Sequence, residues 1–216
     1  MRTLYLSAIA AALAAAPVSA QICTGFPTVD GQKAITAGIG FPEDSKTYSL
    51  RGAVDLTGPL SVNGGVAVGT IDEVDDKAYS FGANVAYELK GLSFSACPVV
   101  GLNYNTFSME ESGATMDVSA LNIPLGFGVG QTFAAGSNSF GLYAVPQFVI
   151  SRASMDVEIP GLGSAEESET DTFFGADIGA LFKAGSFFAG ASVNVTSQAD
   201  SDAVFGLNVG MLFGRR

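Results

Sequence analysis

The segment Tyr79–Leu89, with the sequence YSFGANVAYEL, alternates strictly between two kinds of side chain. Apolar residues and tyrosines occupy every second position from Tyr79 to Leu89. The positions between them hold Ser80, Gly82, Asn84, Ala86 and Glu88. Because successive side chains of a β-strand point to opposite faces, this segment is predicted to be a strand with one apolar face and one face of small and polar residues.

The same alternation recurs along the chain and predicts ten strands. They are placed at residues 33–41, 48–56, 60–70, 79–89, 94–104, 118–129, 140–151, 174–182, 187–196 and 205–213. Each has about the 9–11 residues that a tilted strand needs to cross a membrane. A soluble sandwich is the alternative, but its polar face would carry many Lys, Glu and Thr residues. Here that face carries Gly, Ser, Ala and Asn, which suit the crowded interior of a narrow barrel.

We therefore expect an all-β fold, a single antiparallel up-and-down transmembrane β-barrel of ten strands, with eight strands as the alternative. Short turns at 57–59, 90–91 and 183–186 alternate with longer links at 71–76, 107–117, 152–172 and 197–203. Outer-membrane barrels place short turns in the periplasm and longer loops outside the cell. Most acidic residues fall in the longer links, and aromatic residues lie at both ends of the predicted strands, as two girdles would require.

The first twenty residues are predicted to be a signal peptide. Arg2 precedes the apolar run Leu4–Ala16, and the small residues Val18-Ser19-Ala20 suit cleavage before Gln21. An uncleaved helical anchor is the alternative, although it needs about 20 apolar residues. The predicted organisation is thus a signal peptide at 1–20, a periplasmic N-terminal segment at 21–31, a barrel at 32–213 and a basic tail at 214–216.

Two segments carry a resemblance to a known family. The stretch Asn122–Gly130, NIPLGFGVG, resembles a strand of the small OmpA-like and opacity-type outer-membrane β-barrels, and Gly210–Phe213 resembles their C-terminal assembly signal. Family members usually end on the aromatic residue, whereas Gly214-Arg215-Arg216 follows here. The resemblance implies a bacterial outer-membrane location, contact with membrane lipid and lipopolysaccharide, and insertion by the barrel-assembly machinery. It does not imply one function, because such barrels serve as porins, adhesins and envelope anchors.

The composition excludes several functions. The net charge of −11 argues against nucleic acid as a partner. The chain has no histidine, which is the commonest general acid or base, so an enzyme is not expected and no cofactor is predicted. The acidic residues Asp72, Glu73, Asp75 and Asp76 form a weak candidate for a calcium site, but their spacing matches no complete calcium loop. Solvated loops are the simpler interpretation.

The face opposite the apolar one is predicted to line the lumen. Its polar candidates are Arg51, Asp55, Asn84, Glu88, Asn103, Asn122, Gln147, Asp177, Asn194 and Asn208. They indicate either a narrow hydrophilic pore or an interior sealed by hydrogen-bonded side chains. The predicted function is porin-like passage of small hydrophilic solutes, with a structural or surface-interaction barrel as the alternative. The surface partner is not indicated.

The two cysteines offer a link between the N-terminal segment and the barrel. Cys97 faces the lumen by its position in the alternation, and Cys23 precedes the first predicted strand by ten residues. In an oxidising periplasm the pair can form a disulfide. Such a bond would bring the segment 21–31 into the barrel as a plug; two free thiols are the alternative.

Overall fold

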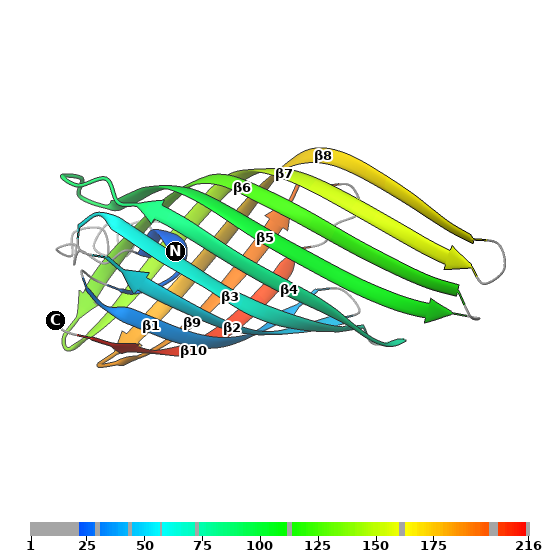
Figure 1. Cartoon of the computed structure of the whole chain (residues 1–216). Coiled ribbons are helices and arrows are strands. Elements are labelled where there is room, and N and C mark those ends of the chain that lie inside the picture. Colours follow the sequence, from blue (N-terminus) through cyan, green and yellow to red (C-terminus); the bar gives the residue numbers. More distant parts are fainter. Residues whose placement is uncertain are drawn as a thin grey trace, which may run out of the picture.

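The computed structural model describes residues 22–28, 31–42, 45–56, 58–71, 74–111, 114–159, 163–198 and 203–214. These residues form a closed barrel of ten strands and one short 3-10 helix (Figure 1). The helix is η1 (Ile22–Thr24), and the strands are β1 (Lys33–Phe41), β2 (Ser45–Asp55), β3 (Leu60–Ile71), β4 (Val74–Tyr87), β5 (Ser95–Glu111), β6 (Ala114–Ala135), β7 (Asn138–Ile159), β8 (Gly163–Ala184), β9 (Phe187–Thr196) and β10 (Val204–Phe213). The predicted signal peptide at 1–20 lies outside the described residues.

The strands follow one another around the barrel in chain order, and every neighbouring pair is antiparallel. The barrel closes where β1 pairs with β10, from Lys33 opposite Phe213 to Phe41 opposite Phe205. Closure leaves no open edge along this part of the sheet. The prediction of a ten-stranded up-and-down barrel is confirmed, and the eight-stranded alternative is not what forms.

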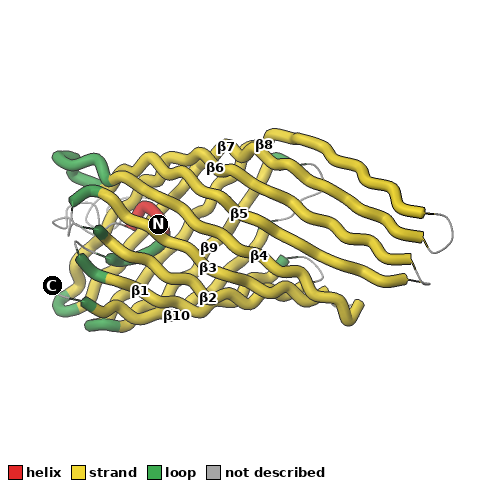
Figure 2. Tube along the Cα trace, viewed as in Figure 1, coloured by secondary structure: helices red, strands yellow, loops and turns green. Residues whose placement is uncertain are grey.

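Four strands are much longer than the sequence predicted. β6, β7 and β8 each have 22 residues and β5 has 17, so the predicted links 107–117 and 152–172 are wrong over most of their length. These strands project beyond the rest of the barrel (Figure 2). Their residues stay in the ladder, for example Met155 opposite Val118 and Glu167. Pairing satisfies the backbone donors and acceptors there even though the side chains are exposed.

The outward face of the barrel is apolar. Leu50, Leu102, Ile178 and Val209 are all more than half exposed. Aromatic side chains are also exposed at both ends of the strands, with Phe205 at 59% near one end of β10 and Phe213 at 45% at the other. A soluble protein rarely exposes so large an apolar surface, whereas a membrane-spanning barrel presents an apolar band between two aromatic girdles. Among the described residues, no helix is long and apolar enough to cross a membrane.

The larger cluster of buried apolar residues contains Ile22 and Phe26 and lies near the end that carries the tight turns and both ends of the described chain (Figure 1). We call this end the turn end and the opposite one the projecting end. The core there joins Ile22 and Phe26 to inward side chains of several strands, namely Ala34, Ala53, Tyr143, Val145, Leu181, Phe188 and Leu212.

Candidate functional site: the polar lumen and the N-terminal segment inside it

The segment Ile22–Thr28 lies inside the barrel at the turn end. Ile22, Phe26 and Thr28 are each 1% exposed, and η1 contacts β5, β6 and β7. A disulfide joins Cys23 to Cys97 on β5, across a sequence separation of 74 residues. The predicted disulfide is therefore present. We call Ile22–Thr28 the plug, because it occupies the lumen and is bonded to the wall.

The plug fits against three glycines of the wall. Gly128 and Gly130 are inward positions of β6, and Gly141 is an inward position of the neighbouring β7. A Cβ atom at Gly128 would collide with the carbonyl oxygen of Cys23. At Gly130 and Gly141 it would collide with the side chain of Ile22. Because glycine has no side chain, these three positions leave the space that η1 fills.

The family-like segment NIPLGFGVG supplies two of these glycines. Its residues Ile123, Leu125, Phe127 and Val129 occupy alternate positions on the outward face, with Leu125 and Phe127 well exposed. Gly128 and Gly130 occupy positions between them and face the plug. One segment therefore presents apolar side chains to the outside and an empty notch to the inside.

Two charged side chains next to the plug, Arg51 and Asp177, are each held by an aromatic residue. The guanidinium of Arg51 lies over the ring of Phe26, 5.0 Å from its centroid, which is within the range of a cation–π contact. The hydroxyl of Tyr143 donates a hydrogen bond to the carboxylate of Asp177, and Ser192 donates one to that hydroxyl. Tyr143 itself fits against Gly25 and Gly179, which have no side chains to obstruct its ring.

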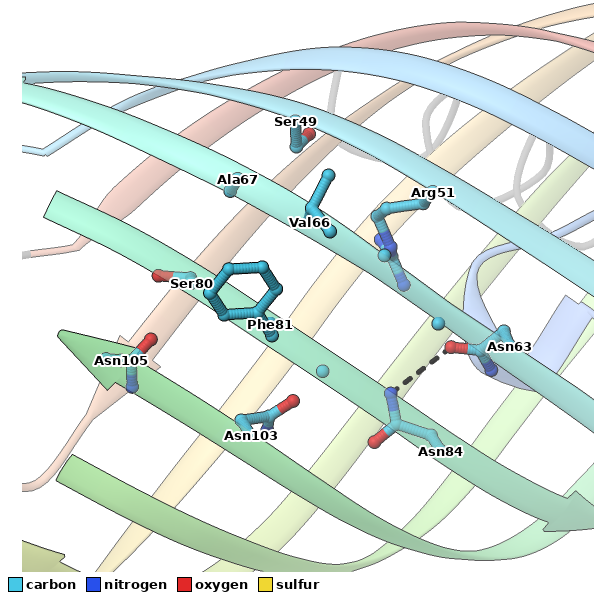
Figure 3. A pocket seen from close by; sticks show the side chains of 13 residues that line it. Ser49, Arg51, Asn63, Val66, Ala67, Ser80, Phe81, Asn84, Asn103 and Asn105 are labelled. Carbon is cyan, nitrogen blue, oxygen red and sulfur yellow. Dashed lines mark hydrogen bonds between the residues drawn. The ribbon is translucent and has the colours of Figure 1, made fainter.

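A polar cavity of about 180 Å³ lies between the plug and the open lumen. Cys23 and Thr24 form its floor, and most of the other lining residues are amides or charged groups: Arg51, Asn63, Asn84, Asn103, Gln147, Asp177 and Asn194. A second cavity of about 230 Å³ shares Arg51, Asn63, Asn84 and Asn103 with the first. Figure 3 shows these four side chains together, with the amide of Asn84 donating to Asn63 at 3.2 Å.

The structure therefore brings together six of the predicted lumen residues: Arg51, Asn84, Asn103, Gln147, Asp177 and Asn194. The other four line neither of these two cavities. Asn122 is half-buried on β6 opposite Asn103, and Asn208 is half-buried on β10. Asp55 is 2% exposed at the turn end, where its N–H donates to the carbonyl of Gln32 at 2.9 Å. Glu88 follows the end of β4 and accepts a hydrogen bond from Ser95 at 3.3 Å.

The candidate calcium ligands do not form a described site. Asp72 and Glu73 lie outside the described residues, and Asp75 and Asp76 lie in β4. Within the part of the chain that the structure describes, no three Cys, Asp or Glu residues are grouped so that they could hold a metal ion.

The inward ring of Tyr143 and the notch formed by the three glycines were not predicted from the sequence. Tyr143 occupies an inward position between the exposed outward residues Leu142 and Phe148, but its ring was not expected in a polar lumen. The three glycines were visible as small inward residues. The available signal was their concentration on two adjacent strands, close to the strand that carries Cys97.

Similar folds occur among solved structures of outer-membrane proteins. The translocator domain of the autotransporter NalP from Neisseria meningitidis is 12% identical, with a TM-score of 0.53; the match covers 100% of this chain and 95% of that one. The outer-membrane protease OmpT from Escherichia coli is 10% identical, with a TM-score of 0.51, covering 86% and 97%. This chain has the fold of an outer-membrane β-barrel. The attachment invasion locus protein Ail of Yersinia pestis is 16% identical with a TM-score of 0.42, covering 86% and 100%.

No family model matches the sequence, and no curated protein matches it. At these levels of identity the NalP translocator domain and OmpT share only a fold with this chain, and the proteolytic activity of OmpT belongs to that protein.

Proposed function

We propose that the protein is a bacterial outer-membrane barrel whose narrow lumen passes small hydrophilic solutes when its plug is released. The burial of the plug inside the barrel and its Cys23–Cys97 bond to the wall support closure of the turn end while the bond is intact. That bond, which ties a buried segment to the wall of an amide-lined lumen, is the observation that carries the proposal. The polar cavity beyond the plug supplies space for water and small hydrophilic solutes.

The exposed apolar band supports a membrane location, in contact with membrane lipid and lipopolysaccharide. The distribution of charge supports one orientation. Lys33 and Lys183 lie at the turn end, whereas Glu166, Glu167 and Glu169 are exposed on the projecting part of β8. We place the turn end in the periplasm, after removal of a signal peptide at 1–20 and insertion by the barrel-assembly machinery. The proposal assigns no catalysis to the chain.

A second candidate function has its own observation. The part of β8 from Gly163 to Phe173 extends past the end of β9, so it has β7 on one side and no strand on the other among the described residues. Such an extended, exposed sheet suits contact with another molecule at the cell surface. This is the surface-interaction alternative, and it operates with the lumen sealed.

Measurements of solute flux distinguish the channel function from the surface-interaction function. The refolded mature protein is placed in liposomes, and swelling is followed in sugars of increasing size, with and without reductant. We expect flux of the smallest solutes only after reduction. The variant in which both Cys23 and Cys97 are Ser should leak without reductant. If the reduced protein and this variant are both folded and impermeable, the channel function is wrong and the projecting sheet becomes the functional surface.

A further inference from the structure

The polar space beyond the plug has the form of a cup. Its floor is Cys23 and Thr24, and its wall includes amides from neighbouring strands. The second cavity continues it past Ser49, Ser80 and Asn105, which lie farther along their strands toward the projecting end. The cup therefore opens toward the projecting end and is closed below by the plug.

Two opposite charges stand in this cup without neutralising each other directly. Arg51 and Asp177 are the charged residues among those that line the 180 Å³ cavity. They attract each other electrostatically, but no direct ion pair between them is found among the described residues. Each is held by another group, Arg51 by the ring of Phe26 and Asp177 by the hydroxyl of Tyr143. Arg51 and Asp177 thus place a positive and a negative group on the wall of the same cavity, and each is held by a different neighbour.

Several amides of the same wall are available to a ligand. The structure shows no protein hydrogen bond to the side chains of Asn103, Gln147 or Asn194 among the described residues. Each amide can donate two hydrogen bonds and also accept. Because buried or half-buried polar groups are stable only when they are hydrogen-bonded, these amides need water or a polar solute.

The charges select among polar solutes. An anion would be repelled by Asp177 and a cation by Arg51, whereas a molecule that carries both charges satisfies both groups. A guanidinium is well shaped to bind a carboxylate through two parallel hydrogen bonds. The lining of the 180 Å³ cavity includes no aromatic side chain on which a sugar ring could stack. The volume is below the range of about 300–1,000 Å³ found for larger organic ligands.

We propose that the cup binds a small zwitterion of the amino-acid class, with its carboxylate on Arg51 and its ammonium group facing Asp177. The amides Asn103, Gln147 and Asn194 hydrogen-bond the remaining polar atoms. This inference rests on the proposed function only in that the plug forms the floor. It concerns equilibrium binding to the closed, oxidised barrel and does not require transport.

The test is calorimetric titration of the oxidised, refolded protein in detergent with four probes. Serine carries both charges, ethanolamine the cation alone, glycolate the anion alone, and glycerol neither. We expect saturable binding of serine and at least about tenfold weaker binding of the other three. Equal binding of glycerol or of either singly charged probe, or the absence of saturable serine binding, overturns the proposal.

Variants locate the site. Arg51→Gln and Asp177→Asn should each weaken serine binding by about 30-fold, because each removes one partner of a largely desolvated charge contact. The double reversal Arg51→Asp with Asp177→Arg should recover part of the loss, since a zwitterion can bind in the opposite direction. Glu88→Gln, outside the cup, is the matched control and should bind normally. Folding of each variant is checked by its gel mobility before and after heating.

The result is separable from that of the flux experiment. Serine binding without reductant-dependent flux would overturn the channel function alone. Flux without serine binding would overturn the zwitterion site alone. If serine affinity were unchanged in both folded single variants, the site would lie elsewhere and this inference would be wrong.

Discussion

Three glycines in the barrel wall determine where the N-terminal segment lies. Gly128, Gly130 and Gly141 leave a notch in which Ile22 and Cys23 fit. The alternation in the sequence already places these glycines on the lumen face. It does not reveal what fills the notch, because the filling residues come from a segment more than 100 residues earlier in the chain.

A single Gly→Ala substitution, which adds one methyl group, tests whether the plug occupies the notch. Gly128→Ala places a Cβ against the backbone of Cys23, which cannot move aside without shifting the plug. We expect a loss of about 1–3 kcal/mol in unfolding free energy, as for other overpacked interiors, and faster reduction of the disulfide by a soluble thiol. Gly175→Ala is the control, because its nearest contact would be an ordinary 3.5 Å. Equal behaviour of the two variants would show that the plug does not occupy the notch.

Among the secondary-structure elements, alternation was sufficient to predict ten strands but not their lengths. Met155, Val157 and Ile159 still alternate with polar residues, yet the acidic residues in this region favoured an interpretation as a loop. The region 163–172 has no apolar alternation at all. It is a strand because it pairs with β7, and that pairing depends on the length of its neighbour, which local sequence does not encode.

The long strands are expected to lie partly in the membrane and partly in water. Introducing a charged side chain at chosen outward positions tests where the boundary lies. Val209→Arg puts a cation midway between Phe205 and Phe213 on the outward face of β10. We expect the substitution to lower the free energy of unfolding in lipid by about 2–4 kcal/mol, which is the cost of placing Arg near the bilayer midplane. Urea titration of folding into liposomes measures this loss.

Ser168→Arg is the control for the same experiment. Ser168 is exposed and shares the outward face of β8 with Phe174 and Ile178, but it lies on the projecting part of the strand, so its substitution should change the free energy of unfolding by less than about 1 kcal/mol. Comparable losses at Val209 and Ser168 would contradict the assignment of the projecting strands to water.

For the molecule as a whole, the disulfide connects the start of the chain to the middle of the barrel. Opening it should release a constraint on a segment of 74 residues in the unfolded chain. We expect Cys97→Ser to lower the free energy of unfolding by about 2–4 kcal/mol, and Cys23→Ser to have the same effect. Denaturant titrations of both variants and of the reduced parent protein should agree. An unchanged midpoint in all three would mean that the bond does not constrain the unfolded chain.

The sequence was most informative where a residue's role depends on its own strand and least where it depends on distant partners. The alternation of inward and outward positions within each strand was enough to select six residues that line one cavity, namely Arg51, Asn84, Asn103, Gln147, Asp177 and Asn194. The contact of Phe26 with Arg51 and the hydrogen bond from Tyr143 to Asp177 were not predictable. They form only when the closed barrel brings the plug and separate strands together.

The central claim is that the plug closes the barrel while its disulfide is intact. The most direct test is single-channel conductance of the refolded mature protein in a planar bilayer, recorded before and after a membrane-impermeant reductant is added. The oxidised barrel should be silent, and stepwise currents should appear when the reductant reaches the turn end. Open channels of the same conductance before and after reduction would contradict the claim.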